Sequence, residues 1–149
     1  QNGASVLNEF CQEHGYTSTH LGREFLASNP TDDNYTSASD CCRLLSDIYS
    51  GTMVNADASA DMLALLKAQT RTGKIPSGIP SGVETANKTG ELSAGDGLGA
   101  VENDIAIVFD KEHPYVLCVL SNNIQNNSSA QETIKKISAD VYQYMTSRK

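Results

Sequence analysis

The segment VETANKTGEL, residues 83–92, marks the point at which the pattern of this chain changes. Upstream of it, apolar residues recur every three or four positions, whereas downstream they gather in the short runs IAIVF at 105–109 and YVLCVL at 115–120. Short apolar runs between turn residues are typical of buried strands. We therefore expect three antiparallel strands, at 83–92, 105–109 and 115–120.

Helical spacing predicts three amphipathic helices before these strands, at residues 5–11, 36–51 and 57–69. Thr36 or Ser37 can cap the second of them. The third is expected to turn Met62, Leu65 and Leu66 inward.

A fourth helix is predicted after the strands. Ser128 or Ser129, with Gln131 or Glu132 three residues later, forms a capping box. The apolar face of this helix comprises Ala130, Ile134, Ile137, Val141 and Tyr144 or Met145. This order gives an α+β plan, with a helical part at 1–72 and, at 73–149, an antiparallel sheet packed by the terminal helix.

Composition narrows the function classes. The 149 residues suit one domain, and their net charge of −7 argues against nucleic acid as a partner. No apolar run approaches the roughly 20 residues of a membrane span. The four cysteines show no C-x-x-C spacing and the three histidines are scattered, so neither a metal site nor a cofactor is expected.

Lys88-Thr89-Gly90 is the most informative triplet of the chain. On a strand, a lysine and a hydroxyl can present an ammonium and a hydrogen-bond donor to a bound carboxylate, while glycine lets a ligand approach the backbone. We expect Lys88 and Thr89 to lie side by side on one open edge. The alternative is a surface strand that ends in a turn, because such triplets also arise by chance.

The context of this triplet resembles a known family. The stretches TANKTG at 85–90, ENDIAIV at 102–108 and YVLCVL at 115–120 resemble the closing half of class A β-lactamases and related penicillin-recognising serine hydrolases. Upstream, LGR at 21–23 with Asn29, followed by DNYTSA at 33–38, resembles the omega loop of that family and the helix after it. The resemblance runs from about Leu7 to Val141.

Two motifs of that family are missing. Its members use a serine nucleophile in S-x-x-K, then S-D-N, and then K-T-G. In this chain no serine has a lysine three residues later, and S-D-N does not occur. The resemblance therefore implies a C-terminal portion of a β-lactamase-like domain, predicted to be inactive alone. Its sheet would be completed by a missing N-terminal portion or by a second copy.

The loop at 16–35 departs from the family at the base that activates water for deacylation. Aligning Arg23 and Asn29 on their family counterparts puts Phe25 at the position of the glutamate base, with Glu24 one residue early. Either a shift of one residue lets Glu24 act as the base, or the base is absent and an acyl-enzyme would be long-lived. Arg23 is expected to pair with Asp32 or Asp33 and hold the loop.

The resemblance also implies the function and the location of the complete protein. It would be an extracytoplasmic serine hydrolase that acts on β-lactams or cell-wall peptides through an acyl-enzyme. Lys88 and Thr89 would bind the substrate carboxylate, Gly90 would admit the ligand, the backbone N–H of Glu91 would be an oxyanion donor, and Asn29 would lie beside the water site. The alternatives are a non-catalytic β-lactam- or peptidoglycan-binding sensor and a D-amino-acid peptidase.

Overall fold

The computed structural model describes residues 3–24, 27, 31–95 and 99–148. The chain forms two compact units, residues 1–41 and 42–149. The first unit contains helix α1 (Gly3–Glu13) and the loop that follows it. Helix α2 (Ala38–Tyr49) contains the boundary, so most of its residues belong to the second unit.

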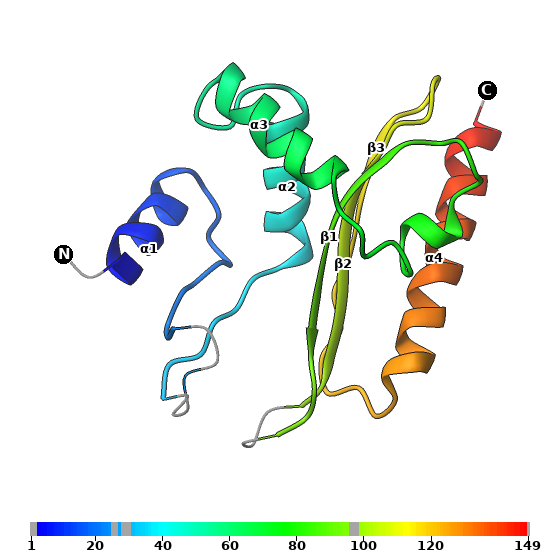
Figure 1. The fold of residues 1–149 in the computed structure, drawn as a ribbon. Coiled ribbons are helices and arrows are strands. Elements are labelled where there is room, and N and C mark those ends of the chain that lie inside the picture. The colour runs from blue at the N-terminus through cyan, green and yellow to red at the C-terminus, as the bar shows by residue number, and fades with distance from the viewer. Residues whose placement is uncertain (1–2, 25–26, 28–30, 96–98, 149) are drawn as a thin grey trace. The chain divides into compact units, whose positions relative to one another are not determined.

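The second unit is built on a three-stranded antiparallel sheet (Figure 1). Its strands are β1 (Thr85–Leu92), β2 (Val101–Val108) and β3 (Tyr115–Val119), in the order β1-β2-β3. Thr85 pairs with Val108 at one end of the β1–β2 ladder, and Leu92 pairs with Val101 at the other. This confirms the α+β plan with three antiparallel strands.

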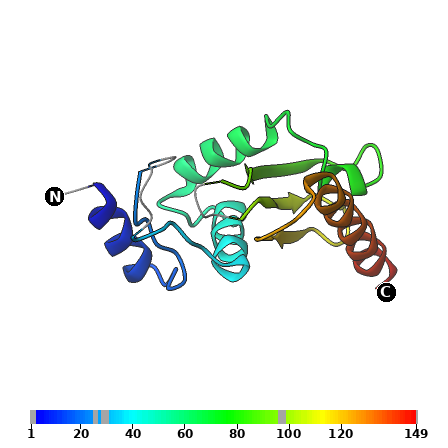
Figure 2. The same ribbon diagram turned by 90° about the horizontal axis from the view of Figure 1, so that it is seen from below.

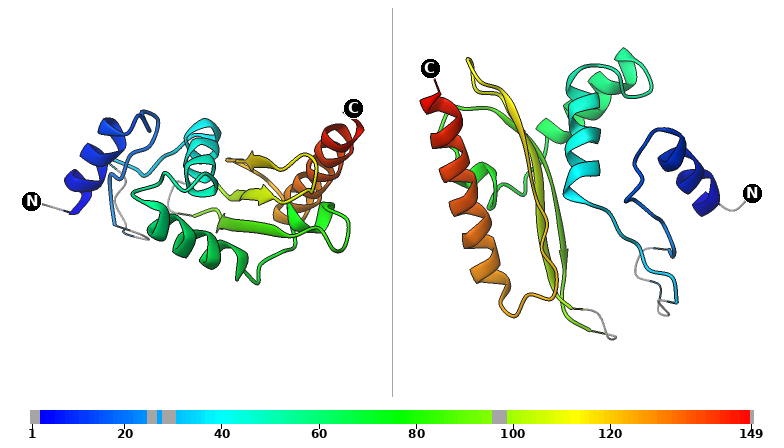
Figure 3. Two further views of the ribbon diagram at one scale, coloured as in Figure 1. Left: turned by 90° about the horizontal axis from the view of Figure 1, so that it is seen from above. Right: turned by 180° about the vertical axis from the view of Figure 1, so that it is seen from behind.

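Helices cover both faces of this sheet (Figures 2 and 3). One face packs against α2 and α3 (Ala56–Lys67) in a core of Leu45, Ile48, Ala86 and Ile107. The other face packs against α4 (Asn127–Ser147) and the 3-10 turn η1 (Pro76–Gly78) around Ile75, Ala106 and Ile134. The sheet is therefore a middle layer, as the nearly continuous apolar run of β2 requires.

Two helix starts were only partly predicted. Ser37 accepts a hydrogen bond at its Oγ from the backbone N–H of Asp40 at 3.1 Å, which confirms one of the two predicted residues for the start of α2. The predicted capping box of α4 is wrong. The side chain of Asn126 caps that helix by accepting from the N–H of Ser129 at 2.9 Å, so the helix begins before the two predicted serines.

The buried faces of α3 and α4 differ in part from the predicted ones. Met62 and Leu66 pack against the core, but Leu65 is 73% exposed, since residues only one position apart on a helix point about 100° away from each other. On α4, Ile137 is partly exposed, whereas Ser138 is fully buried and donates to the carbonyl of Ile75 at 2.8 Å. A hydroxyl with a backbone partner thus occupies the core position.

Candidate functional site

Strand β1 lies at one end of the described sheet and carries the Lys88-Thr89-Gly90 triplet. Just before it, the amide of Phe109 donates to the carbonyl of Glu84 at 3.0 Å, so these residues form a hydrogen-bonded pair in the same register. In an antiparallel ladder every second residue bonds to the partner strand. The even-numbered residues of β1 therefore bond to β2, and the backbone N–H and C=O of Glu91 face the outer edge.

The two side chains of the triplet lie on opposite faces of β1, because successive residues of a strand alternate. Lys88 is exposed, and its ammonium donates to the carbonyl of Thr89. Thr89 is only 6% exposed. Lys88 is available at the surface, and Thr89 points to the face that carries Glu91. The expectation that both side chains serve one open edge of the strand stays a prediction.

Gly90 is not required by the packing of this unit. A methyl group placed there would contact the side chain of Asn103 at 3.7 Å, which is ordinary van der Waals distance, and the backbone does not need a positive φ. The described residues thus give Gly90 no structural role that alanine could not fill.

An ionic network centred on the buried Lys74 lies beneath this part of β1. The ammonium of Lys74 is 2.9 Å from Oε1 of Glu91 and 2.6 Å from Oε2 of Glu102, and it donates to the carbonyl of Asn103 at 2.9 Å. Glu91 and Glu102 are directly opposite each other in the β1–β2 ladder. Arg71 reaches Oε2 of Glu91 at 3.1 Å from the solvent side.

Burial and hydrogen bonds compete in setting the acidity of this network. Hydrogen bonding from Lys74 lowers the pKa of Glu91, with a smaller contribution from the Thr89 hydroxyl. Burial raises the pKa of Glu102, but bonds from Lys74, Asn127 and Gln131 together outweigh it and leave this pKa below its ordinary value. Both carboxyls are therefore ionised at neutral pH.

Asp104 completes the network on β2 and is fully buried. It accepts from the N–H of Ile75 at 2.9 Å and from the side-chain amide of Asn87 at 3.0 Å. Burial raises the pKa of Asp104 despite these donors. The bond to Ile75 fixes the chain next to Lys74, so Asp104 helps to place that lysine between the strands.

In the first unit, hydrogen bonds join the two arms of the loop at 16–35. The backbones of His20 and Tyr35 exchange hydrogen bonds at 2.9 and 3.1 Å, and Nε2 of His20 lies 2.9 Å from the carboxylate of Asp32. Arg23 pairs with Asp33 at 2.7 Å, which selects Asp33 between its two predicted partners. Residues 20–23 are therefore held next to residues 32–35.

Of the predicted deacylation residues, the structure describes only Glu24. Glu24 is exposed, and its carbonyl accepts from the N–H of Ala27 at 3.1 Å. Phe25 and Asn29 lie outside the described residues. The choice between Glu24 and an absent base stays a prediction.

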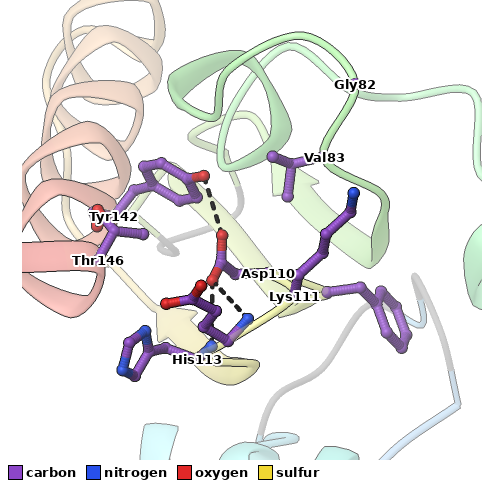
Figure 4. Close-up of a pocket in the computed structure, with 9 residues that line it drawn as sticks. Gly82, Val83, Asp110, Lys111, His113, Tyr142 and Thr146 are labelled. Atoms are coloured by element: carbon purple, nitrogen blue, oxygen red, sulfur yellow. Dashed lines mark hydrogen bonds between the residues drawn. The ribbon is translucent and has the colours of Figure 1, made fainter. Parts of the chain in front are cut away.

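A pocket that the sequence did not predict lies near the start of β1. Its volume is about 360 Å³, and it is lined by residues from three segments: Gly82 and Val83, the β2–β3 turn at 109–113, and Tyr142 and Thr146 of α4. Figure 4 shows the hydroxyl of Tyr142 directed at Asp110, to which it donates at 3.1 Å. The amides of Glu112 and His113 donate to the same carboxylate, so Asp110 ties the turn to the end of α4.

Neither a metal cluster nor a membrane span occurs in the described part of the chain. Within it, no group of three or more His, Cys, Asp or Glu side chains is arranged to hold a metal ion. No helix there combines the length and apolar character that crossing a bilayer needs.

Comparison with known proteins identifies the family. A family model described as "Beta-lactamase enzyme family" matches residues 2–145. The chain belongs to the β-lactamase enzyme family. It is 30% identical over 138 residues to "Beta-lactamase 3" of Bacillus cereus, an alignment that covers 89% of this chain and 42% of that relative.

Solved structures show that the β-lactamase-family chain has a portion of the class A fold. The β-lactamase from Sphaerobacter thermophilus superposes with a TM-score of 0.85 at 20% identity, covering 97% of this chain and 54% of that one. A reconstructed class A β-lactamase of the last common ancestor of Gram-negative bacteria gives 0.78 at 20% identity, covering 96% and 55%. The chain thus spans about half the length of these relatives.

Proposed function

We propose that this chain is the C-terminal portion of a serine hydrolase domain that opens β-lactams through an acyl-enzyme. The observation that carries the proposal is the edge of β1, where an exposed lysine lies beside outward-facing backbone groups three residues later. The proposal includes an extracytoplasmic location and a nucleophilic serine outside these 149 residues.

Each residue at the edge of β1 has a different role in binding the substrate. The ammonium of Lys88 attracts the substrate carboxylate, and Gly90 lets the substrate approach the edge. As the serine oxygen attacks the lactam carbonyl and loses its proton, the N–H of Glu91 donates to the developing oxyanion. When this tetrahedral intermediate collapses, the C–N bond breaks and the ring nitrogen takes up the proton that the serine lost. Thr89, on the buried face, supports the Glu91 carboxylate.

The loop at 16–35 governs release of the acyl group. With phenylalanine at the aligned base position, water attacks the ester without a general base, which ordinarily contributes about 10²- to 10⁴-fold. A long-lived acyl-enzyme follows. That property also favours a second candidate, a β-lactam-binding sensor, because a sensor needs acylation and slow release.

The test measures acylation of the protein encoded by the complete reading frame. Lys88→Ala is expected to slow acylation by a penicillin by roughly 10- to 100-fold, since a charge-assisted hydrogen bond contributes about 1.5 to 3 kcal/mol. Lys111→Ala, at the opposite end of the sheet, is the matched control and should leave the rate unchanged. Equal rates for wild type and Lys88→Ala would refute the assignment of Lys88.

The isolated 149-residue chain serves as a second control. Because it contains no S-x-x-K serine, it should not turn over nitrocefin. Turnover above background by purified chain would show that another residue here acts as the nucleophile.

A further inference from the structure

Lys74 is the central cation of the network beneath β1. Its side chain is 5% exposed, and its ammonium donates to the carbonyl of Asn103 and forms ion pairs with one oxygen of Glu91 and one oxygen of Glu102. Its position is fixed by its neighbour Ile75, which is fully buried and bonded through its N–H to Asp104 and through its carbonyl to Ser138.

The two carboxylates that Lys74 joins would otherwise repel each other. Glu91 and Glu102 are opposite one another and share a face. Their pair belongs to the non-hydrogen-bonded positions of the ladder, where side chains come closest and like charges destabilise pairing. Lys74 therefore holds together the end of β1 that carries the outward-facing N–H of Glu91.

We propose that Lys74 is a positioning residue for oxyanion stabilisation: it binds the Glu91 carboxylate on the inner face and so keeps that negative charge away from the oxyanion that the Glu91 N–H receives. This inference rests on the proposed function, because it assigns a purpose to a residue that touches no substrate. A free carboxylate on the same residue would oppose the developing charge in a water-poor site.

Arg71 does not duplicate this role. Its side chain is 70% exposed, and it reaches Glu91 from solvent, where ion pairs contribute little and are screened by salt. Arg71→Gln should change acylation less than about twofold.

The decisive variants keep the buried charge balanced. Lys74→Gln/Glu102→Gln removes one cation and one anion, so the interior gains no net charge, but Glu91 loses its buried partner. In the protein from the complete reading frame, this double variant should acylate about tenfold or more slowly per folded molecule. Lys67→Gln/Glu84→Gln is the matched control, since it removes an ion pair of 2.8 Å next to the start of β1, and its rate should not change.

Adding Glu91→Gln separates positioning from a structural role. If Lys74 acts by restraining the charge of Glu91, the triple variant regains acylation to within about threefold of wild type, as a coupled pair requires. A triple variant as slow as the double variant would overturn the proposal, because the loss would then come from altered strand packing. The folded fraction of each variant is measured by thermal unfolding.

A second measurement needs no variant and no substrate. In the wild-type protein, the amide resonance of Glu91 should titrate with a carboxyl pKa below the ordinary value for Glu, because the ammonium of Lys74 and the guanidinium of Arg71 lie 2.9 and 3.1 Å from its oxygens. An ordinary or raised pKa for Glu91 would overturn the proposed role of Lys74 even if the double variant does not fold. If the wild-type protein titrates as expected but is never acylated, the proposed function is rejected, whereas the ion pair between Lys74 and Glu91 is supported.

Discussion

Gly78 shows how a single residue fixes the layer that supports the site. A methyl group there would collide with the carbonyl of Lys135 and come within 2.8 Å of Cβ of Ser138, both on α4. Gly78→Ala should therefore lower the free energy of unfolding by about 1–3 kcal/mol, as overpacking does. Gly73→Ala is the control, because its methyl group meets no described atom within 4 Å. Equal stability of the two variants in urea unfolding would contradict the close packing of η1 on α4.

At the same scale, the two lysines of the site differ in how well the sequence predicts them. Lys88 was predictable because it belongs to a triplet with a chemical meaning on a strand. Lys74 was not, since it lies in a segment rich in glycine and proline, and its partners Glu91 and Glu102 are 17 and 28 positions away. Only the strand register brings those three charges together.

Among the elements, the start of α4 is where the cap in the structure differs from the cap predicted from the sequence. Asn126 provides the cap, whereas the sequence pattern favoured Ser128 or Ser129. Asn126→Ala should cost about 1 kcal/mol of stability, and Ser128→Ala should cost almost nothing. Chemical denaturation of both variants gives the comparison, and the opposite ranking would restore the predicted capping box.

The strands were predicted more accurately at their apolar ends than at their polar ones. β3 was placed almost fully by its apolar run, but β2 begins at Val101, four residues before the predicted start. Those four residues include Glu102 and Asp104, which pattern reasoning excludes from a buried strand. Glu102 is tolerated because it pairs with Lys74 and accepts from the side-chain amides of Asn127 and Gln131. Asp104 is tolerated because it accepts from Asn87 and from the N–H of Ile75.

On the scale of the whole molecule, the carboxyls around Lys74 predict how the free energy of unfolding depends on pH. Glu91 and Glu102 have lowered folded-state pKa values, so their contribution is present above the unfolded value of about 4.3 and is lost as pH falls through the folded values. Asp104, whose pKa is raised, acts in the opposite direction and is neutralised first.

Unfolding free energy should therefore decline as pH is lowered below about 4.3, and more gently in Glu91→Gln. Urea titrations between pH 6 and pH 3 measure this decline. If the unfolding free energy of the variant and of the wild type depends on pH in the same way, Glu91 is not held in an ion pair with Lys74 in the folded chain.

The family membership, the sheet and the K-T-G edge support one central proposal: the complete protein is acylated by β-lactams and releases the acyl group slowly. Intact-mass spectrometry of that protein, sampled over time after mixing with a penicillin, tests it most directly. We expect a covalent adduct with the mass of the whole antibiotic to appear and persist, and Phe25→Glu to shorten its lifetime. An unchanged mass at every time point, for folded protein with the antibiotic left intact, would contradict it.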